Sequence, residues 1–360
     1  DGSFMPYHSQ LYTTLPISSR VLSLSVDDIN GDHLDDAIVT VRNGEPPTQA
    51  PSIYIFYAKG DGSFQDGGSI TLPETTPLPF AVLANLNQDK YPDLAITSSP
   101  YGNGSLSSTL YIYTNDGTGR FKQAQALNTG QEDGDLIAAD MNGNGRLDLL
   151  TFGQNGTIWT NDGQAQFSPH PISFSRPPFA VTVGDVDGQN GPDLIYQLYR
   201  SINGQNTIYI QPNSGSGTTF GTAWDVSFAG DDYASTPTVA DLNDDGKMDI
   251  AISHETNGMT VLLGNGNGSF QTPTRYDLQD DPSAILQTDI NNDGAMDLVV
   301  PHHRSYYADL MLNDGTGQFT PHTEPGLPNW TIFLDNNSND ILDSGDISTT
   351  TDANGYYTFT

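Results

Sequence analysis

Short apolar runs alternate with polar, glycine-rich segments along the whole chain. Runs such as MDIAIS, MDLVVP and PDLAIT each follow an acidic segment, and runs such as SIYIFY, TLYIYT and MTVLLG are rich in β-branched and aromatic residues. These properties favour β-strands, and no stretch shows the 3.6-residue periodicity of an amphipathic helix. The pattern therefore predicts an all-β protein built from short strands.

An acidic nine-residue segment recurs seven times, at a mean spacing of about 51 residues. Its template is Asp-x-(Asp/Asn)-x-(Asp/Asn/Gln)-x-x-x-Asp, and Asn85 replaces the first Asp in the second copy. The copies are DINGDHLDD at 28–36, NLNQDKYPD at 85–93, DMNGNGRLD at 140–148, DVDGQNGPD at 185–193, DLNDDGKMD at 241–249, DINNDGAMD at 289–297 and DNNSNDILD at 335–343.

A glycine turn that closes on Phe also occurs seven times and alternates with the acidic segment without a skip. Its copies are at 1–4, 60–64, 117–121, 163–167, 215–220, 266–270 and 315–319. Each repeat then contains about four short strands, which is typical of a β-propeller blade.

The single domain of residues 1–360 is therefore predicted to be a propeller of four-stranded antiparallel blades. Because the chain opens on the turn DGSF and ends on GYYTFT, we expect seven blades, with the N-terminal strand completing the last one. The alternative is a ring of six blades with a tail at each end.

Charge and composition narrow the classes of function. The net charge is −32 and only 12 residues are Lys or Arg, which disfavours nucleic acid and anionic membranes as partners. The chain has no Cys, so disulfides and Cys-based metal sites are excluded. No apolar run approaches the roughly 18 residues of a membrane-spanning helix, so we expect no membrane insertion.

The acidic segments have the composition of a calcium site. Side chains at positions 1, 3 and 5 of a tight loop can turn inward, and the carboxylate at position 9 closes the cage with the oxygen ligands that Ca²⁺ prefers. Asp and Asn are also ordinary turn residues, but seven copies favour metal. The candidate ligands are Asp28, Asn30, Asp32, Asp36, Asn85, Asn87, Asp89, Asp93, Asp140, Asn142, Asn144, Asp148, Asp185, Asp187, Gln189, Asp193, Asp241, Asn243, Asp245, Asp249, Asp289, Asn291, Asp293, Asp297, Asp335, Asn337, Asn339 and Asp343.

The copies are not equal in acidity. We expect the strongest sites at 28–36, 241–249 and 289–297, and less certain ones at 85–93 and 185–193, where Asn85 and Gln189 depart from the template. Several structural Ca²⁺ ions are predicted, and open loops of this kind suit millimolar extracellular calcium. This argues for an extracellular or cell-surface protein whose secretion signal lies outside the chain.

The segments DLNDDGKMDIAI and DINNDGAMDLVV, each followed by a GNGSF or GTGQF turn, resemble FG-GAP/VCBS-type repeats. That family includes the propeller of integrin α chains, a fungal N-acetylglucosamine-binding lectin and many bacterial surface and secreted proteins. The resemblance covers about residues 1–320 and implies a calcium-bearing propeller used for adhesion or ligand binding. It also implies that positions 1, 3, 5 and 9 bind the ion. The Phe-Gly and Gly-Ala-Pro elements of the integrin form are not present as such.

The last segment, 326–360, is similar to the opening of an SdrD-type B repeat, a calcium-binding β-sandwich of bacterial surface adhesins. The acidic loop, DSGD and TDANGYYTF carry this similarity. The segment either supplies strands of a seventh blade or begins a following module.

No catalytic motif stands out, because GxSxG, HExxH and P-loop sequences do not occur. We interpret His254 and Glu255 as a solvated turn. Recognition is expected in the b–c connections, the loops between the second and third strands of a blade, at 42–52, 98–108, 199–206 and 301–308. The candidate ligand-binding residues are His302, His303, Arg304, Tyr306, Tyr307, Tyr101, Tyr199 and Arg200.

The sequence thus favours non-enzymatic adhesion to, or binding of, a glycan or an extracellular protein. The alternatives are a polysaccharide-active enzyme or its accessory domain, and a structural spacer.

Overall fold

The fold is that of a computed structural model. It describes residues 20–42, 52–61, 63–72, 77–100, 108–130, 133–153, 155–174, 176–198, 205–229, 235–254, 258–278, 282–302, 308–321, 331–334 and 347–350. All regular elements in these ranges are β-strands, as the apolar pattern predicts. The described part contains no helix that is long and apolar enough to cross a bilayer.

Six antiparallel sheets of four strands follow one another along the chain, each formed by four consecutive strands. The first two contain β1 (Arg20–Asp27), β2 (Asp36–Arg42), β3 (Ser52–Ala58) and β4 (Phe64–Thr71), then β5 (Pro77–Ala84), β6 (Asp93–Pro100), β7 (Thr109–Asn115) and β8 (Phe121–Asn128). The next two contain β9 (Asp133–Ala139), β10 (Asp148–Gly153), β11 (Gly156–Asn161) and β12 (Phe167–Ile172), then β13 (Pro178–Gly184), β14 (Asp193–Leu198), β15 (Gln205–Gln211) and β16 (Trp224–Ala229). The last two contain β17 (Thr238–Ala240), β18 (Asp249–His254), β19 (Gly258–Leu262) and β20 (Thr274–Asp277), then β21 (Leu286–Thr288), β22 (Asp297–Pro301), β23 (Ala308–Asn313) and β24 (Phe319–Pro321).

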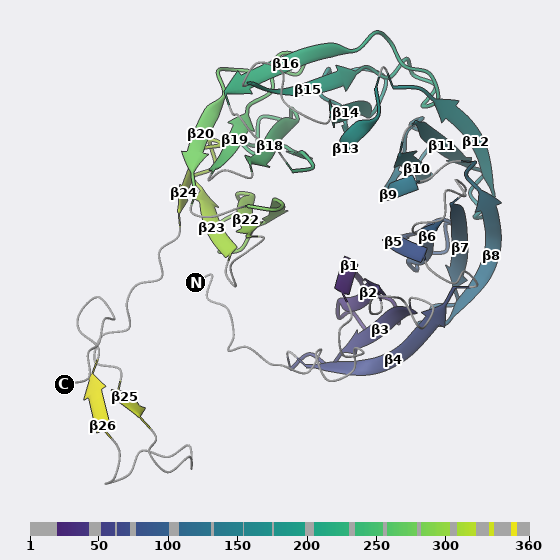
Figure 1. The fold of residues 1–360 in the computed structure, drawn as a ribbon, viewed down its shortest axis with the longest axis horizontal. Coiled ribbons are helices and arrows are strands. Elements are labelled where there is room, and N and C mark those ends of the chain that lie inside the picture. The colour runs from purple at the N-terminus through teal and green to yellow at the C-terminus, as the bar shows by residue number, and fades with distance from the viewer. Residues whose placement is uncertain are drawn as a thin grey trace.

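The sheets are the blades of a β-propeller. Figure 1 shows them arranged around a common centre, with first strands such as β5 and β9 inside and fourth strands such as β8 and β12 on the circumference. Between the first two blades, Ile38, Ile55, Leu94 and Tyr111 share one buried apolar cluster. Comparable clusters join each later pair of neighbouring blades. Each blade thereby buries the face that it could not bury alone.

The expectation of a seventh blade is wrong, and the alternative of six blades with tails matches the described residues. β25 (Thr331–Leu334) and β26 (Ile347–Thr350) pair with each other as a two-stranded sheet, which lies apart from the six blades in Figure 1. Residues 1–19, which include the turn expected to complete a seventh blade, lie outside the described part. An acidic segment marks a strand–loop–strand unit, and two strands do not make a blade. The assignment of 326–360 to a following module stays a prediction.

The first and last blades carry exposed apolar side chains on their innermost strands. Leu24 and Val26 of β1 are 61% and 54% exposed, and Leu286 of β21 is 58% exposed. β1 still contacts the second blade, because the Ser25 hydroxyl donates to the Ala81 carbonyl of β5 at 2.9 Å.

Buried asparagines join four of the blades to the blade before them. Each asparagine ends the third strand of its blade or lies just after it. Its Nδ2 donates to the carbonyl of the second residue in the acidic segment of the blade before. The pairs are Asn115 with Ile29, Asn161 with Leu86, Asn213 with Met141 and Asn313 with Leu242, at 2.7–2.8 Å. The same nitrogen also donates to a carbonyl in the blade's own acidic segment. One amide thus fixes two adjacent blades in register.

We expect Asn213→Ala to destabilise the protein by about 2 to 4 kcal/mol, because it leaves two buried carbonyls without their donor. Asn265→Ala is the matched control, since Asn265 is exposed and its side-chain amide donates to the Ser269 hydroxyl in its own turn. Chemical denaturation of both variants measures the difference. Equal free energies of unfolding for the two variants would contradict this role.

Candidate metal centre

The six acidic segments within the described part form one kind of loop, joining the first and second strands of each blade. Positions 4 and 6 of every loop have a positive φ, between 55° and 94°. Gly occupies both positions in the third loop, as Gly143 and Gly145, whereas Asp, Asn, Gln, Lys or His occupies at least one of them in the others. These left-handed residues curl the chain so that the side chains at positions 1, 3 and 5 face the inside of the loop.

The aspartate at position 9 closes each loop from the start of the second strand. These closing aspartates are Asp36, Asp93, Asp148, Asp193, Asp249 and Asp297, each at most 1% exposed. In all six, Oδ1 accepts a backbone N–H from the end of the third strand, at 2.7–2.9 Å. In five, Oδ2 accepts the N–H of the second loop residue, at 2.9–3.1 Å. The carboxylate therefore ties together three separate segments of its blade.

Burial has an electrostatic cost at these positions. Desolvation raises the pKa of Asp36, Asp93, Asp148 and Asp249, although the backbone donors partly oppose the shift. For Asp193 the pKa is raised to about 6, chiefly by burial, while the Asn213 N–H lowers it and the charge of Asp187 raises it. A positive ion in the loop would reverse this penalty by favouring the carboxylate form.

The residues at the front of the loop mainly bind the loop's own backbone. In the fifth loop, Oδ1 of Asp241 accepts the N–H of Asp245 at 3.1 Å, and its Oδ2 accepts the N–H of Gly246 at 2.7 Å. The first residues of the other Asp-initiated loops accept equivalent N–H groups. These bonds orient the oxygen atoms toward the loop interior before any ion is considered.

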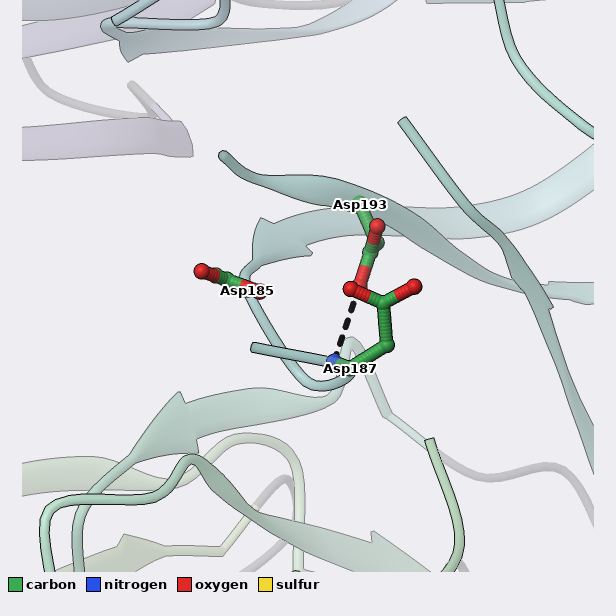
Figure 2. A group of neighbouring side chains, drawn as sticks. All are labelled: Asp185, Asp187 and Asp193. Atoms are coloured by element: carbon green, nitrogen blue, oxygen red, sulfur yellow. Dashed lines mark hydrogen bonds between the residues drawn. The ribbon is translucent and has the colours of Figure 1, made fainter. Parts of the chain in front are cut away.

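Three carboxylates gather in the loop at 185–193. Oxygen atoms of Asp185, Asp187 and Asp193 all lie within 4.8 Å of one another, and within the described residues no other three acidic or histidine side chains meet so closely. Figure 2 shows Asp187 beside Asp193, with the Asp187 N–H donating to Asp193 Oδ2 at 3.3 Å, and Asp185 across the loop. Since Ca²⁺ binds oxygen at about 2.3–2.6 Å, ligands on opposite sides of one ion lie about 5 Å apart, so this group fits calcium.

A second observation comes from the loop at 85–93. Oδ1 of Asn85, the first residue of that loop, is buried and has no hydrogen-bond partner. A buried carbonyl oxygen without a donor is costly, and an amide oxygen is an ordinary calcium ligand. The departure of Asn85 from the template is therefore compatible with a metal site.

Comparison with known proteins agrees with the repeat pattern. Residues 28–96, 85–151, 185–252 and 241–300 match the family described as FG-GAP-like repeat. The chain belongs to the FG-GAP-like repeat family. Each matched segment of this FG-GAP-like chain begins at the first residue of an acidic loop and ends within the second strand of the following blade.

Solved structures are similar to the FG-GAP-like chain in fold. A protein from Lactobacillus plantarum has a TM-score of 0.58 at 15% identity, with 84% of each chain covered. The periplasmic gluconolactonase of Pseudomonas aeruginosa has a TM-score of 0.57 at 12% identity, covering 83% of this chain and 84% of that one. The GH93 α-L-arabinofuranosidase of Fusarium graminearum has a TM-score of 0.56 at 12% identity, covering 83% and 95%. At these identities the likeness concerns the propeller fold alone. Among curated proteins, none matches the chain.

In the other described FG-GAP-like loops, no three carboxylates come within 4.8 Å of one another. In the loops at 85–93 and 289–297, the third residue turns its Nδ2 to the carboxylate at position 5. In the loop at 241–249, Lys247 Nζ lies 2.9 Å from Asp245 Oδ2. The closest gathering of carboxylates is thus at 185–193, and not at 28–36, 241–249 or 289–297, where the acidity of the sequence favoured it. Asp335, Asn337, Asn339 and Asp343 lie outside the described residues.

Of the expected ligand-binding residues, His302 lies in the described part of the chain. His302 is buried, and its Nε2 lies 3.1 Å from Asp309 Oδ2. His303, Arg304, Tyr306, Tyr307, Tyr101, Tyr199 and Arg200 lie outside the described residues. The interpretation of His254 as solvated is wrong, because its side chain is buried between Asn206 of the fourth blade and Thr260 of its own blade; Glu255 is not among the described residues.

The blade-joining asparagines have a structural role that the two repeated motifs do not predict. A signal for them exists, because Asn precedes the glycine turn in NDGTG at 115–119, NDGQA at 161–165 and NDGTG at 313–317.

The raised pKa of Asp193 predicts that the stability of the protein depends on pH when a chelator is present. The folded state favours the protonated carboxyl, so this contribution to stability is present below the unfolded pKa near 3.8 and is lost as pH rises through about 6. The free energy of unfolding in EDTA should therefore fall between pH 4 and 6.5, by at most about 1.4 kcal/mol per pH unit for one proton. Denaturation of Asp193→Asn over the same range should show a shallower decline. Identical slopes would mean that Asp193 does not titrate in this range.

Proposed function

We propose that the chain is a calcium-stabilised, non-enzymatic ligand-binding propeller of a secreted or cell-surface protein. The observation that carries the proposal is the group formed by Asp185, Asp187 and Asp193, whose oxygens meet within 4.8 Å. Three carboxylates at that separation repel one another unless a cation lies among them. The family's loops and their recurrence in every blade support the same conclusion.

Calcium is the ion that suits these donors. Every candidate ligand is a carboxylate or a carboxamide, and the chain has no Cys, so softer metals find no thiolate ligand here. Asp185, Asp187 and Asp193 would hold the ion with Gln189, and backbone carbonyls would complete six to eight oxygen ligands. The ion would supply positive charge that stabilises the closing carboxylate and would cross-link the loop to the second strand.

A role outside the cell follows from the expected affinity. Open loops with two or three carboxylates bind calcium in the range of extracellular concentrations rather than trace cytosolic ones. An ion that binds only the folded state then stabilises it by mass action. The net charge of −32 also disfavours nucleic acid as a partner.

Binding is favoured over catalysis because the carboxylates of the acidic loops already accept backbone hydrogen bonds. The closing aspartates accept backbone N–H groups, and the front residues orient the loops. The enzymes among the similar folds share 12% identity with this chain, and a propeller by itself does not imply an activity. Recognition of a glycan or an extracellular protein is assigned to the b–c connections, on the face opposite the acidic loops.

Calcium should raise the melting temperature, and the size of the shift should depend on Asp185 and Asp187. At 100 times the dissociation constant, one ion stabilises the fold by about 2.7 kcal/mol. The double variant Asp185→Asn, Asp187→Asn should lose that part of the calcium response while its stability in EDTA stays near that of the parent. Calorimetry in EDTA and in millimolar calcium measures both quantities.

Asp193→Asn separates the metal role from the structural one. Because this carboxylate also accepts N–H groups from Asn213 and Val186, the variant should be less stable in EDTA as well. A parent protein whose melting temperature is the same in EDTA and calcium would overturn the calcium proposal.

Ligand binding through the b–c connections is tested on arrays of glycans and extracellular matrix proteins. We expect retention of at least one ligand class, with a loss of tenfold or more when His303, Arg304, Tyr306 and Tyr307 are all replaced by Ser. Retention that is unchanged in this variant would contradict the assignment of this face. Cleavage of a polysaccharide without stable binding would favour the enzyme alternative.

A further inference from the structure

A cavity of about 570 Å³ lies at the junction of the first and second blades. Its walls come from β3, β4 and the glycine turn that leads into β8, and β4 and β8 run along the circumference in Figure 1. Ile55, Tyr57 and Phe121 provide apolar surface, and Asp66 and Arg120 provide opposite charges. The volume falls within the roughly 300–1,000 Å³ of small-molecule sites. The cavity is separate from the acidic loops and from the b–c connections.

A glycine in β4 removes the side chain that would otherwise cross this junction. Gly68 pairs with Ile55, which lies three residues before Ala58, the donor to the closing Asp36. A Cβ placed on Gly68 would have no atom within 4 Å, so the space above it is open. Every described blade has such a donor to its closing aspartate. The residue that pairs with the position three before this donor can therefore be compared between blades.

Two other blades carry a bridging side chain at this position. In the second blade it is Gln125, which pairs with Ile112; its Nε2 donates to Gln166 Oε1 of the third blade at 2.9 Å. In the fourth blade it is Trp224, which pairs with Ile210; its Nε1 donates to the Gly268 carbonyl of the fifth blade at 3.2 Å. The first junction thus lacks, at Gly68, the bridging side chain that these two junctions have.

The second unusual residue is the cation at the cavity rim. Arg120 immediately precedes the Phe of its glycine turn, and the other described turns carry an uncharged residue there. These residues are Ser63, Gln166, Thr219, Ser269 and Gln318. In a chain with 12 basic residues and a net charge of −32, a guanidinium placed beside this cavity distinguishes it from the other junctions.

Tyr57 fixes the wall between the two blades. Its hydroxyl donates to the Gly119 carbonyl at 3.1 Å, and a Cβ on Gly119 would collide with the ring. The bulge in β4 brings Gly67 equally close to the same ring. The ring is therefore held in place from both sides, which gives a preformed aromatic surface rather than one that a ligand must order.

The lining selects a particular ligand chemistry. A purely apolar ligand would cover the charged ends of the exposed Asp66 and Arg120 side chains without offering either of them a hydrogen bond. A polyanion would meet the carboxylate and the strongly negative chain. A neutral ring with several hydroxyl groups satisfies both charges by hydrogen bonds, because the carboxylate accepts and the guanidinium donates, while its C–H face covers Tyr57 and Phe121.

We infer that this cavity binds one neutral pyranose unit of a saccharide. Asp66, Ser69 and Arg120 hold the sugar hydroxyls, and Tyr57 and Phe121 contact the ring. This inference goes beyond the proposed function, since it places a ligand on the rim of the acidic-loop face and needs neither the b–c connections nor calcium in the loop at 185–193.

Saturation-transfer NMR on the full chain tests it with three probes, the methyl glycosides of β-D-glucopyranose, β-D-galactopyranose and α-D-mannopyranose. At least one probe should receive saturation from aromatic protons. The transfer should fall at least fivefold in Arg120→Ala and in Ser69→Trp, which narrows the exposed mouth of the cavity. Lys122→Ala is the control, because Lys122 is an exposed cation of β8 that does not line the cavity.

Thermal melts confirm that the variants are folded before the NMR comparison is made. Loss in Arg120→Ala and Ser69→Trp with retention in Lys122→Ala supports the inference. The absence of transfer to all three probes would overturn it, and so would equal transfer in the parent and in both cavity variants. Neither result depends on the calcium-induced melting shift, so the two proposals fail separately.

Discussion

The arrangement of each blade depends on one buried carboxylate. The closing aspartate accepts an N–H from the end of the third strand through one oxygen, and in five blades an N–H from the start of the loop through the other. Three segments that are distant in sequence thereby meet at one side chain. At four junctions the asparagine of the next blade donates to the carbonyl of the second residue of this loop. There the position of the carboxylate also influences where the neighbouring blade docks.

This arrangement links the fold to the proposed metal. A charged group buried in a blade is unfavourable, and desolvation raises the pKa of most closing aspartates, that of Asp193 to about 6. Backbone donors offset part of that cost without any ion. A cation among Asp185, Asp187 and Asp193 would offset more. The loops are thus structural devices in every blade, and the proposed calcium strengthens a hydrogen-bond scheme that exists already.

Much of the fold could be predicted from the sequence, because each repeat encodes a strand, an acidic loop and a glycine turn in a fixed order. The number of blades could not, since the last acidic segment accompanies two strands that pair with each other. Sequence acidity also did not identify the loop with the closest carboxylates: the conformations of Asp185 and Asp187 depend on which backbone N–H groups they accept. The sequence makes His302 a candidate ligand-binding residue, and nothing in PHHRSYYA reveals that its imidazole lies beside Asp309 of the adjacent strand.

The sequence also does not reveal the cavity at the junction of the first and second blades. Gly68, Gln125 and Trp224 are equivalent only once the bulges and strand registers are known. The role of the closing carboxylates is tested most directly by native-state amide hydrogen exchange in EDTA. The amides to follow lie at or just after the end of the third strands, and are those of Ala58, Asn115, Asn161, Asn213, Gly264 and Asn313. If the closing carboxylates hold these amides without metal, the amides exchange as slowly as those at the centres of the second strands. Exchange as fast as in exposed turns would contradict it.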